Sequence, residues 1–168
     1  MSESVRRRHG PRPVLVMAAA LVLLVVVLQA CHGLSILRPS VYNSYTLQAL
    51  AWREGRSYLA QDVEHLELAI HQGRYFVSFP PVPSVPIYFL TFLFGAAVPD
   101  GLLVLAYALI AFAALEETLR RAQWRPWPAS VMAFLLCTAS SMLPLLLMGA
   151  VWYQAQVMAF MWTARAIS

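Results

Sequence analysis

The chain has 168 residues, of which 60% are hydrophobic and only 12% are charged, and its formal net charge is +4. Soluble globular domains carry about a quarter charged residues. The composition therefore excludes a soluble domain and predicts an all-α integral membrane protein with about four hydrophobic helices. The positive charges are arginines at the ends of apolar segments, whereas nucleic-acid binding needs a basic patch on an exposed face. Nucleic-acid binding is excluded as well.

A basic tail opens the chain at residues 1–13, and an apolar run follows from Val14 to Ala30. At about 1.5 Å per residue this run is ~26 Å long, so we expect residues 14–32 to form a transmembrane helix. Basic residues favour the cytoplasmic side of a membrane. The N-terminus should therefore be cytoplasmic, and the residues after the helix should lie outside. The arginines of the tail are Arg6, Arg7, Arg8 and Arg12.

The same N-terminal region also admits a lipoprotein signal, because Leu28-Gln-Ala-Cys31 resembles a cleavage site. Gln29 fits that pattern poorly, so an uncleaved anchor is favoured. The second cysteine, Cys137, falls in the middle of a later apolar segment. The two thiols would then lie at different depths, and we expect neither a disulfide nor a metal site from them.

Residues 33–83 form a polar outer loop in which two short amphipathic helices are expected. The first begins at Pro39-Ser40 and stops at Gly55. The second covers Tyr58–Gln72 and stops at Gly73. Their apolar faces suit the headgroup boundary of a membrane, where aromatic rings are buried and their polar tips stay wet. These faces carry Tyr42, Tyr45, Ala49 and Trp52 in the first helix, and Leu59, Val63, Leu66 and Ile70 in the second.

Three polar residues, Glu64, Glu67 and His71, would share one side of the second expected helix. One interpretation is a solvated helix flank. The other is a general base, Glu67, because partial desolvation near a membrane suits a carboxylate to proton abstraction. Arg74 could then bind a phosphate with its planar guanidinium group. His65 lies six positions before His71, on another helix face, so no metal site is expected.

An aromatic, β-prone strip from Gly73 to Pro83 leads into the apolar residues 84–98, which contain Pro86. This segment is short, so we expect it to be interfacial or re-entrant, with a spanning helix as the alternative. Charge supports that choice. If residues 84–98 and the next apolar run both crossed, the arginine-rich linker 120–128 would lie outside, against the usual distribution of positive charge.

The remaining segments follow from the same rule. Residues 101–119 should cross inward, the linker 120–128 should be cytoplasmic, and residues 129–149 should cross outward with a kink at Pro144. Residues 151–168 should begin a further helix that is cut short. Its first polar and aromatic side chains would either anchor it at the interface or line an outer cavity. These side chains are Trp152, Gln154 and Gln156.

The order of segments resembles a known family. A basic N-terminus and one span precede the outer loop, which reads Leu47-Gln-Ala-Leu-Ala-Trp-Arg-Glu-Gly55 and then Leu66-Glu-Leu-Ala69. Gly73-Arg-Tyr-Phe-Val-Ser-Phe-Pro-Pro-Val-Pro83 and Phe92-Leu-Phe-Gly95 follow. Together they are similar to the N-terminal portion of GT-C-type integral membrane glycosyltransferases, the group of protein O-mannosyltransferases and lipid A aminoarabinose transferases. Members of that group have more spans, so the chain is expected to be a fragment.

The resemblance implies that a sugar moves from a polyprenyl-phosphate donor to an acceptor at the outer face of the inner (plasma) membrane. It also implies a carboxylate base in the outer loop and requires no cofactor. Because residues 32–45 contain no acid, Glu67 or Asp62 is expected to serve as that base. Arg74 and Arg53 would contact the donor phosphate, with Tyr75 as a further substrate-binding residue.

A second hypothesis is a small, non-catalytic, multi-pass membrane protein that packs on the helices of a partner. Its contacts would be the lipid bilayer and other membrane helices, without a sugar donor. It predicts that Glu67→Gln and Arg74→Ala leave function intact, while substitutions in the spans abolish it.

Overall fold

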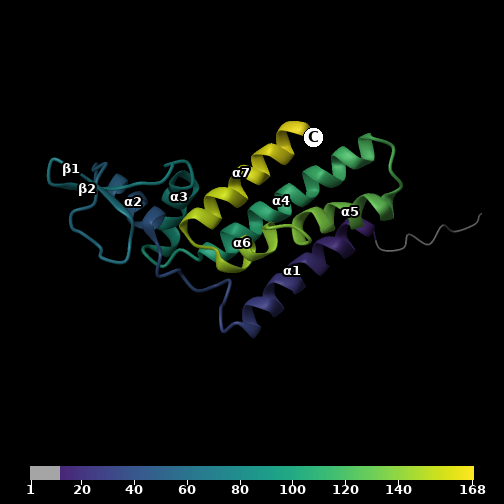
Figure 1. Ribbon diagram of the computed structural model, residues 1–168, viewed down its shortest axis with the longest axis horizontal. Helices are drawn as coiled ribbons and strands as arrows, with labels where there is room; N and C mark the ends of the chain where they lie inside the picture. Colours follow the sequence, from purple (N-terminus) through teal and green to yellow (C-terminus); the bar gives the residue numbers. More distant parts are fainter. Residues whose placement is uncertain (1–11) are drawn as a thin grey trace, which may run out of the picture.

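The computed structural model describes residues 12–168. Most of the basic tail therefore lies outside the described residues. The described part is mainly helical and elongated, with a helical bundle at one end and a smaller lobe at the other (Figure 1). The bundle contains α1 (Pro13–Cys31), α4 (Asp100–Arg121), α5 (Pro126–Thr138), α6 (Met142–Met148) and α7 (Val151–Ile167). The lobe contains α2 (Ser44–Arg53), β1 (Leu68–His71), β2 (Arg74–Val77) and α3 (Ser84–Phe94).

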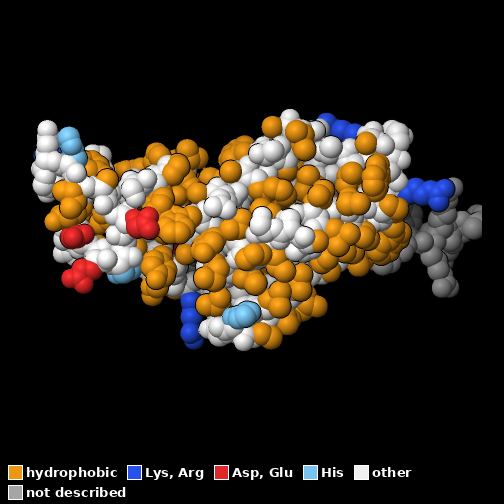
Figure 2. Space-filling model, in the orientation of Figure 1, with side chains coloured by type: hydrophobic (Ala, Val, Ile, Leu, Met, Phe, Trp, Pro, Cys, Tyr) orange, Lys and Arg blue, Asp and Glu red, His pale blue; other side chains and the backbone are white. Residues whose placement is uncertain are grey.

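Two helices of the bundle, α1 and α4, are long and apolar enough to cross a membrane. A third span results if α5 and α6, which meet at a bend of 64°, are counted as one. Hydrophobic side chains also cover much of the bundle face that Figure 2 shows. These features indicate association with a membrane, through two or three candidate spans where the sequence predicted about four hydrophobic helices.

Helix α4 is central to the bundle and packs against α1, α5, α6 and α7. Its buried side includes small residues such as Ala108, Ala111 and Ala114. Small side chains allow helix backbones to approach closely, which is the usual basis of helix packing in membranes. Phe112 of α4 and Leu21 of α1 fill the same core, and both are fully buried.

The kink that was expected at Pro144 is found earlier in the chain, between α5 and α6. The chain leaves the helix at residues 139–141, before α6 begins, and Pro144 is the third residue of α6. A proline in the first helical turn removes no hydrogen bond, because the N–H groups of that turn have no partner within the helix. The break therefore lies in Ala139-Ser140-Ser141, and the Ser140 hydroxyl accepts a hydrogen bond from the Met142 N–H at 3.2 Å.

The second expected helix, Tyr58–Gln72, is wrong. Its C-terminal part is strand β1, which pairs with β2 in an antiparallel hairpin, and the rest is loop with an isolated bridge from Leu59 to Tyr75. Gln72 and Gly73 form the turn with φ of 50° and 70°. Positive φ at both central residues is the mark of the tight turn that matches the twist of a hairpin. The hairpin is thus the exception to the expected all-α class, and Glu64, Glu67 and His71 share no helix face.

Helix α2 is shorter than expected, beginning at Ser44 rather than at Pro39. Beyond its end at Arg53, Gly55 has φ of 72°, as a left-handed helix stop requires. Of the expected apolar face, Tyr45 and Ala49 are buried, whereas Tyr42 precedes the helix and is exposed.

Helix α3 packs on α2, and its 11 residues extend only ~16 Å, too short to cross a bilayer. The Ser84 hydroxyl donates a hydrogen bond to Gln48 Oε1 at 2.6 Å, and Ile87 and Thr91 are buried in the same interface. The opposite face of α3 is apolar and exposed. It carries Val85, Phe89, Phe92 and Leu93.

Candidate functional site

A cavity of about 600 Å³ lies where the bundle meets the lobe. This volume is typical of small-molecule sites. Five parts of the chain form its walls: the end of α1 with the loop that follows it, the start of α2, residues 65–67 with Phe79, the start of α4, and residues 147–153. We call this end of the bundle the cavity end.

Asp100, the first residue of α4, is the buried carboxylate of the cavity wall, and only 4% of the residue is exposed. Its Oδ2 accepts a hydrogen bond from the Ser40 N–H at 2.9 Å. The positive end of the helix dipole also favours an anion at this position. Within residues 12–168, no ion pair involves Asp100. A buried carboxylate without a cation is costly, and such groups are concentrated at functional sites.

Two glycines allow the backbone to close around Asp100. A Cβ atom on Gly101 would lie 2.9 Å from the Cα of Ile36, so the loop after α1 rests directly on the start of α4. Gly149 has φ of 61°, and a Cβ atom there would lie 3.5 Å from the Cα of Gly101. Three backbone segments therefore meet at one point beside the cavity, and glycine at position 101 is required for that contact.

Gln29 fixes the floor of the cavity. Its Nε2 donates hydrogen bonds to the carbonyl oxygens of Leu147 at 3.1 Å and Leu146 at 3.4 Å, which lie in the last turn of α6 and have no partner within that helix. Its own Oε1 is buried and finds no partner among the described residues, and the same holds for the Ser44 hydroxyl. The cavity wall therefore contains buried polar atoms that have no hydrogen-bond partner among the described residues.

Charged side chains border the cavity where it meets solvent. Arg38 and Glu67 are exposed residues of its wall. The Glu67 carbonyl accepts a hydrogen bond from the Ser78 hydroxyl at 2.7 Å, which fixes this part of the wall. His65 Nε2 lies 3.0 Å from the Val41 carbonyl oxygen, which can only accept, so this nitrogen carries the proton. The loop after α1 is therefore held to residues 65–67.

Only some of the residues predicted from the sequence reach the cavity. Glu67 and Trp152 line it, and the Trp152 ring lies 5.8 Å from that of Phe79. Gln154 is buried within the bundle, and Gln156 is exposed on the outside of α7. Asp100 was missed, because Pro99-Asp100 looks like a break between two apolar runs.

The other predicted residues have partners within the lobe, and they are not part of the cavity wall. The Arg74 guanidinium lies over the Tyr58 ring at 4.6 Å. Arg53 donates to the Thr91 carbonyl at 2.9 Å and lies over the Phe92 ring at 4.3 Å. The Tyr75 carbonyl accepts from the Leu59 N–H at 2.7 Å, and Asp62 Oδ1 accepts from the Val63 N–H at 2.8 Å. Apart from the local contact of Asp62 with Val63, these contacts join separate segments of the lobe.

Within residues 12–168, no group of three or more His, Cys, Asp or Glu side chains could hold a metal ion. The fold and the site together define a helical, membrane-associated class of protein with a ligand-sized cavity between bundle and lobe. Comparison with protein-family models, curated proteins and solved structures found no match.

Proposed function

We propose that the chain is a membrane glycosyltransferase-like protein, or a part of one, in which the cavity binds a polyprenyl-phosphate-linked sugar at the outer face of the plasma membrane. The observation that carries this proposal is the buried carboxylate of Asp100 in a cavity of about 600 Å³ at one end of the membrane helices. The arginine-bearing end of the bundle, with the N-terminus, is then cytoplasmic, as the distribution of positive charge favours.

Sugar transfer to a hydroxyl acceptor needs a group that takes the acceptor's proton as its oxygen bonds to the anomeric carbon and the polyprenyl phosphate leaves. Asp100 suits this role better than Asp62, which lies outside the cavity wall. Glu67 is the second candidate because it borders the cavity, although it is exposed. A carboxylate already shielded from water needs less rearrangement when the substrate binds.

The donor phosphate needs a cation. Arg38 is the arginine of the cavity wall, whereas the guanidinium groups of Arg74 and Arg53 lie over aromatic rings of the lobe. We therefore assign phosphate binding to Arg38 in place of Arg74 and Arg53. The exposed apolar face of α3, with Phe89 and Phe92, would rest in the outer leaflet and leave the cavity open to a lipid-borne donor.

The binding part of the proposal is tested with undecaprenyl phosphate and the protein in lipid nanodiscs. Arg38→Gln should weaken binding at least fivefold, because a charge-assisted hydrogen bond to phosphate is lost. Arg74→Gln is the matched control and should leave binding unchanged. Undecaprenol, which lacks the phosphate, should not distinguish Arg38→Gln from the parent. Equal loss in the two arginine variants, or no loss in either, would contradict the assignment.

The transfer part is tested with Asp100→Asn. Removing a general base lowers the rate of transfer by about 100-fold or more, whereas it should not weaken binding of an anionic lipid. The assay measures the loss of radiolabelled sugar from the lipid fraction of membranes that supply the donor. Unchanged transfer in Asp100→Asn would exclude Asp100 as the base, and the same assay on Glu67→Gln would then test Glu67.

A non-catalytic, partner-binding protein is the second candidate, and the exposure of α1 favours it. In the 18-residue apolar stretch of α1 only 17% is buried, compared with 44% in the corresponding stretch of α4. Leu15 and Leu23 are more than 60% exposed and must contact lipid or another helix. If this candidate holds, Asp100→Asn and Glu67→Gln have no effect on function, and bulky or polar substitutions along α1 abolish it.

A further inference from the structure

Three buried polar side chains lie in the cavity wall, and each comes from a different helix. They are Gln29 of α1, Ser44 of α2 and Asp100 of α4, and none of these residues is more than 4% exposed. The other polar and charged residues of the wall, such as Arg38 and Glu67, are partly or fully exposed. The wall therefore combines a buried polar part with charged residues at the border with solvent.

Backbone contacts bring these three residues to the same part of the cavity. Ser40, whose N–H donates to Asp100 Oδ2 at 2.9 Å, lies four residues before Ser44 in the chain. A Cβ atom on Gly149 would lie 4.0 Å from the carbonyl carbon of Asp100. Gln29 donates a hydrogen bond of 3.1 Å to the carbonyl oxygen two residues before Gly149. We call Gln29, Ser44 and Asp100 the polar corner of the cavity.

The polar corner has unused hydrogen-bonding capacity. Gln29 Oε1 and Ser44 Oγ are buried, and neither has a partner within residues 12–168. The Gln29 amide cannot be turned round to give its oxygen a partner, because its Nε2 faces two carbonyl oxygens of α6, which can only accept. A buried polar atom without a partner is unfavourable. A ligand that supplies the missing partners removes this penalty.

The chemistry of the polar corner selects the kind of ligand. Gln29 Oε1 only accepts hydrogen bonds, whereas the Ser44 hydroxyl donates and accepts, so hydroxyl groups of a ligand can satisfy both. Within residues 12–168, Asp100 has no cationic partner, so a second carboxylate beside it would be repelled. We propose, as an extension that rests on the proposed function, that the polar corner binds the sugar ring of the lipid-linked donor. It selects a hydroxyl-rich sugar without an acidic group, and the donor phosphate lies at Arg38.

The sugar selectivity is tested in lipid nanodiscs with undecaprenyl phosphate alone, with its glucose derivative and with its glucuronic acid derivative. The glucose lipid should bind about threefold or more tightly than the bare phosphate, and the glucuronic acid lipid should bind at least ~10-fold more weakly than the glucose lipid. Asp100→Asn should bring these last two affinities close together, because it removes the charge that repels the carboxylate. Equal binding of both sugar lipids by the parent would overturn this proposal, whereas a failure of undecaprenyl phosphate to bind would contradict the proposed function itself.

The hydrogen bonds of the polar corner are tested with Ser44→Ala, since Gln29 also holds α6. This variant should bind the glucose lipid about threefold to tenfold more weakly, the usual effect of one hydrogen bond, and should bind undecaprenyl phosphate like the parent. Thr46→Val is the matched control. Thr46 lies on the same helix, is 1% exposed and has a hydroxyl without a partner among the described residues, but it is not part of the cavity wall. Thr46→Val should bind both lipids like the parent. No loss in Ser44→Ala, or the same loss in both variants, would overturn the proposal.

Discussion

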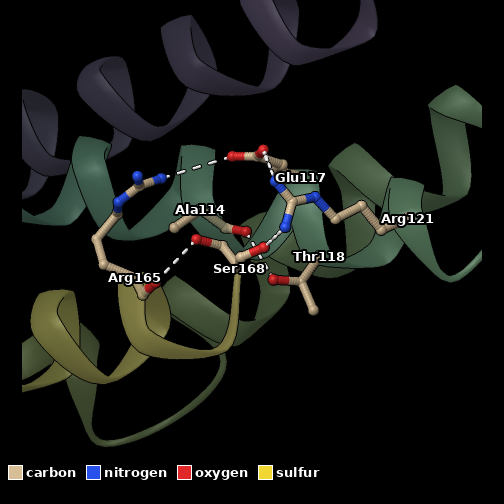
Figure 3. Close-up of polar contacts among 6 residues, drawn as sticks. All are labelled: Ala114, Glu117, Thr118, Arg121, Arg165 and Ser168. Carbon is tan, nitrogen blue, oxygen red and sulfur yellow. Dashed lines mark hydrogen bonds and ion pairs between the residues drawn. The ribbon is translucent and has the colours of Figure 1, made fainter.

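The two ends of helix α4 hold acidic side chains in opposite surroundings. At the cavity end, Asp100 is 4% exposed, and Ser40 donates its hydrogen bond. At the other end the Glu117 side chain is 44% exposed and lies between two arginines, 2.6 Å from Arg121 and 3.5 Å from Arg165 (Figure 3). One carboxylate is buried without a cation, and the other is exposed with two.

This difference indicates different roles for the two carboxylates. Glu117 joins helix ends, whereas Asp100 belongs to the cavity. Exposed ion pairs each contribute little to stability because water and salt screen them. Around Glu117, the ion pair with Arg165 joins the ends of α4 and α7, and Arg121 of α4 also donates a hydrogen bond to the Ser168 carbonyl. A buried, unpaired carboxylate lowers stability, so we attribute Asp100 to the proposed function of the cavity and not to the folding of the bundle.

The largest change in stability is expected from Gly101→Ala. The added methyl group would lie 2.9 Å from the Cα of Ile36, so the loop after α1 must move away from α4. We expect a loss of about 1–3 kcal/mol in the free energy of unfolding, together with weaker binding of undecaprenyl phosphate. Denaturant unfolding in detergent measures the first. Ala106→Leu, on the exposed side of α4, is the control and should change neither quantity.

A change of opposite sign is expected from Asp100→Asn. The amide oxygen of asparagine can still accept the Ser40 hydrogen bond, while the buried negative charge is gone. We expect the free energy of unfolding to rise by about 1–2 kcal/mol, whereas sugar transfer falls. Such a trade of activity for stability is characteristic of residues retained for function. A variant that is less stable than the parent would show that Asp100 is a structural residue.

Hydropathy placed the helices of the bundle well, because long apolar runs have few alternatives to a helix in a membrane. The helix expected at residues 14–32 is α1, Pro13–Cys31, and that expected at residues 101–119 is α4, Asp100–Arg121. The break at residues 139–141 was not found. Ser140-Ser141 is a weaker signal than Pro144, and its effect depends on the packing of α6 against α1, α4 and α7.

The lobe was harder to predict, since short segments with mixed polarity fit a helix and a strand almost equally well. Residues 68–71 match helical spacing, yet they pair with Arg74–Val77, whose β-prone character the sequence did show. Gly73, which was expected to stop a helix, is instead the second central residue of the hairpin turn. The cavity itself depends on contacts across long stretches of sequence, such as Ser40 with Asp100 and Gln29 with Leu147. Periodicity along the chain carries no information about such pairs.

Tyr45, in the lobe beside the cavity end, gives a smaller test of the contrast between buried and exposed polar groups. It is 2% exposed, and its hydroxyl finds no partner among the described residues. Burial raises the pKa of Tyr45 from its ordinary value of 10.0 to about 12. The folded protein therefore favours the neutral form of the Tyr45 hydroxyl. This contribution to the free energy of unfolding is complete below pH 10 and is lost as the pH rises from 10 to 12.

Tyr45→Phe removes both the unpaired hydroxyl and its ionisation. The variant should be about 1 kcal/mol more stable at pH 7, and the excess over the parent should grow between pH 10 and 12. Unfolding by circular dichroism at several pH values measures this. Tyr42→Phe, at an exposed position, is the control and should be as stable as the parent at pH 7. An excess that does not change with pH would mean that the Tyr45 hydroxyl ionises equally easily in the folded and unfolded chains.

The smallest effect is expected at the arginine-bearing end. Glu117→Gln breaks the ion pairs with Arg121 and Arg165, yet all three side chains remain in contact with water. The free energy of unfolding should fall by less than about 1 kcal/mol, and 1 M salt should reduce the difference, because the screening length for exposed charges is then only ~3 Å. Glu116→Gln is the adjacent control, since no ion pair within residues 12–168 involves Glu116. A loss as large as that of Gly101→Ala would mean that the ion pairs at this end hold the bundle together, and the contrast between the two ends of α4 would fail.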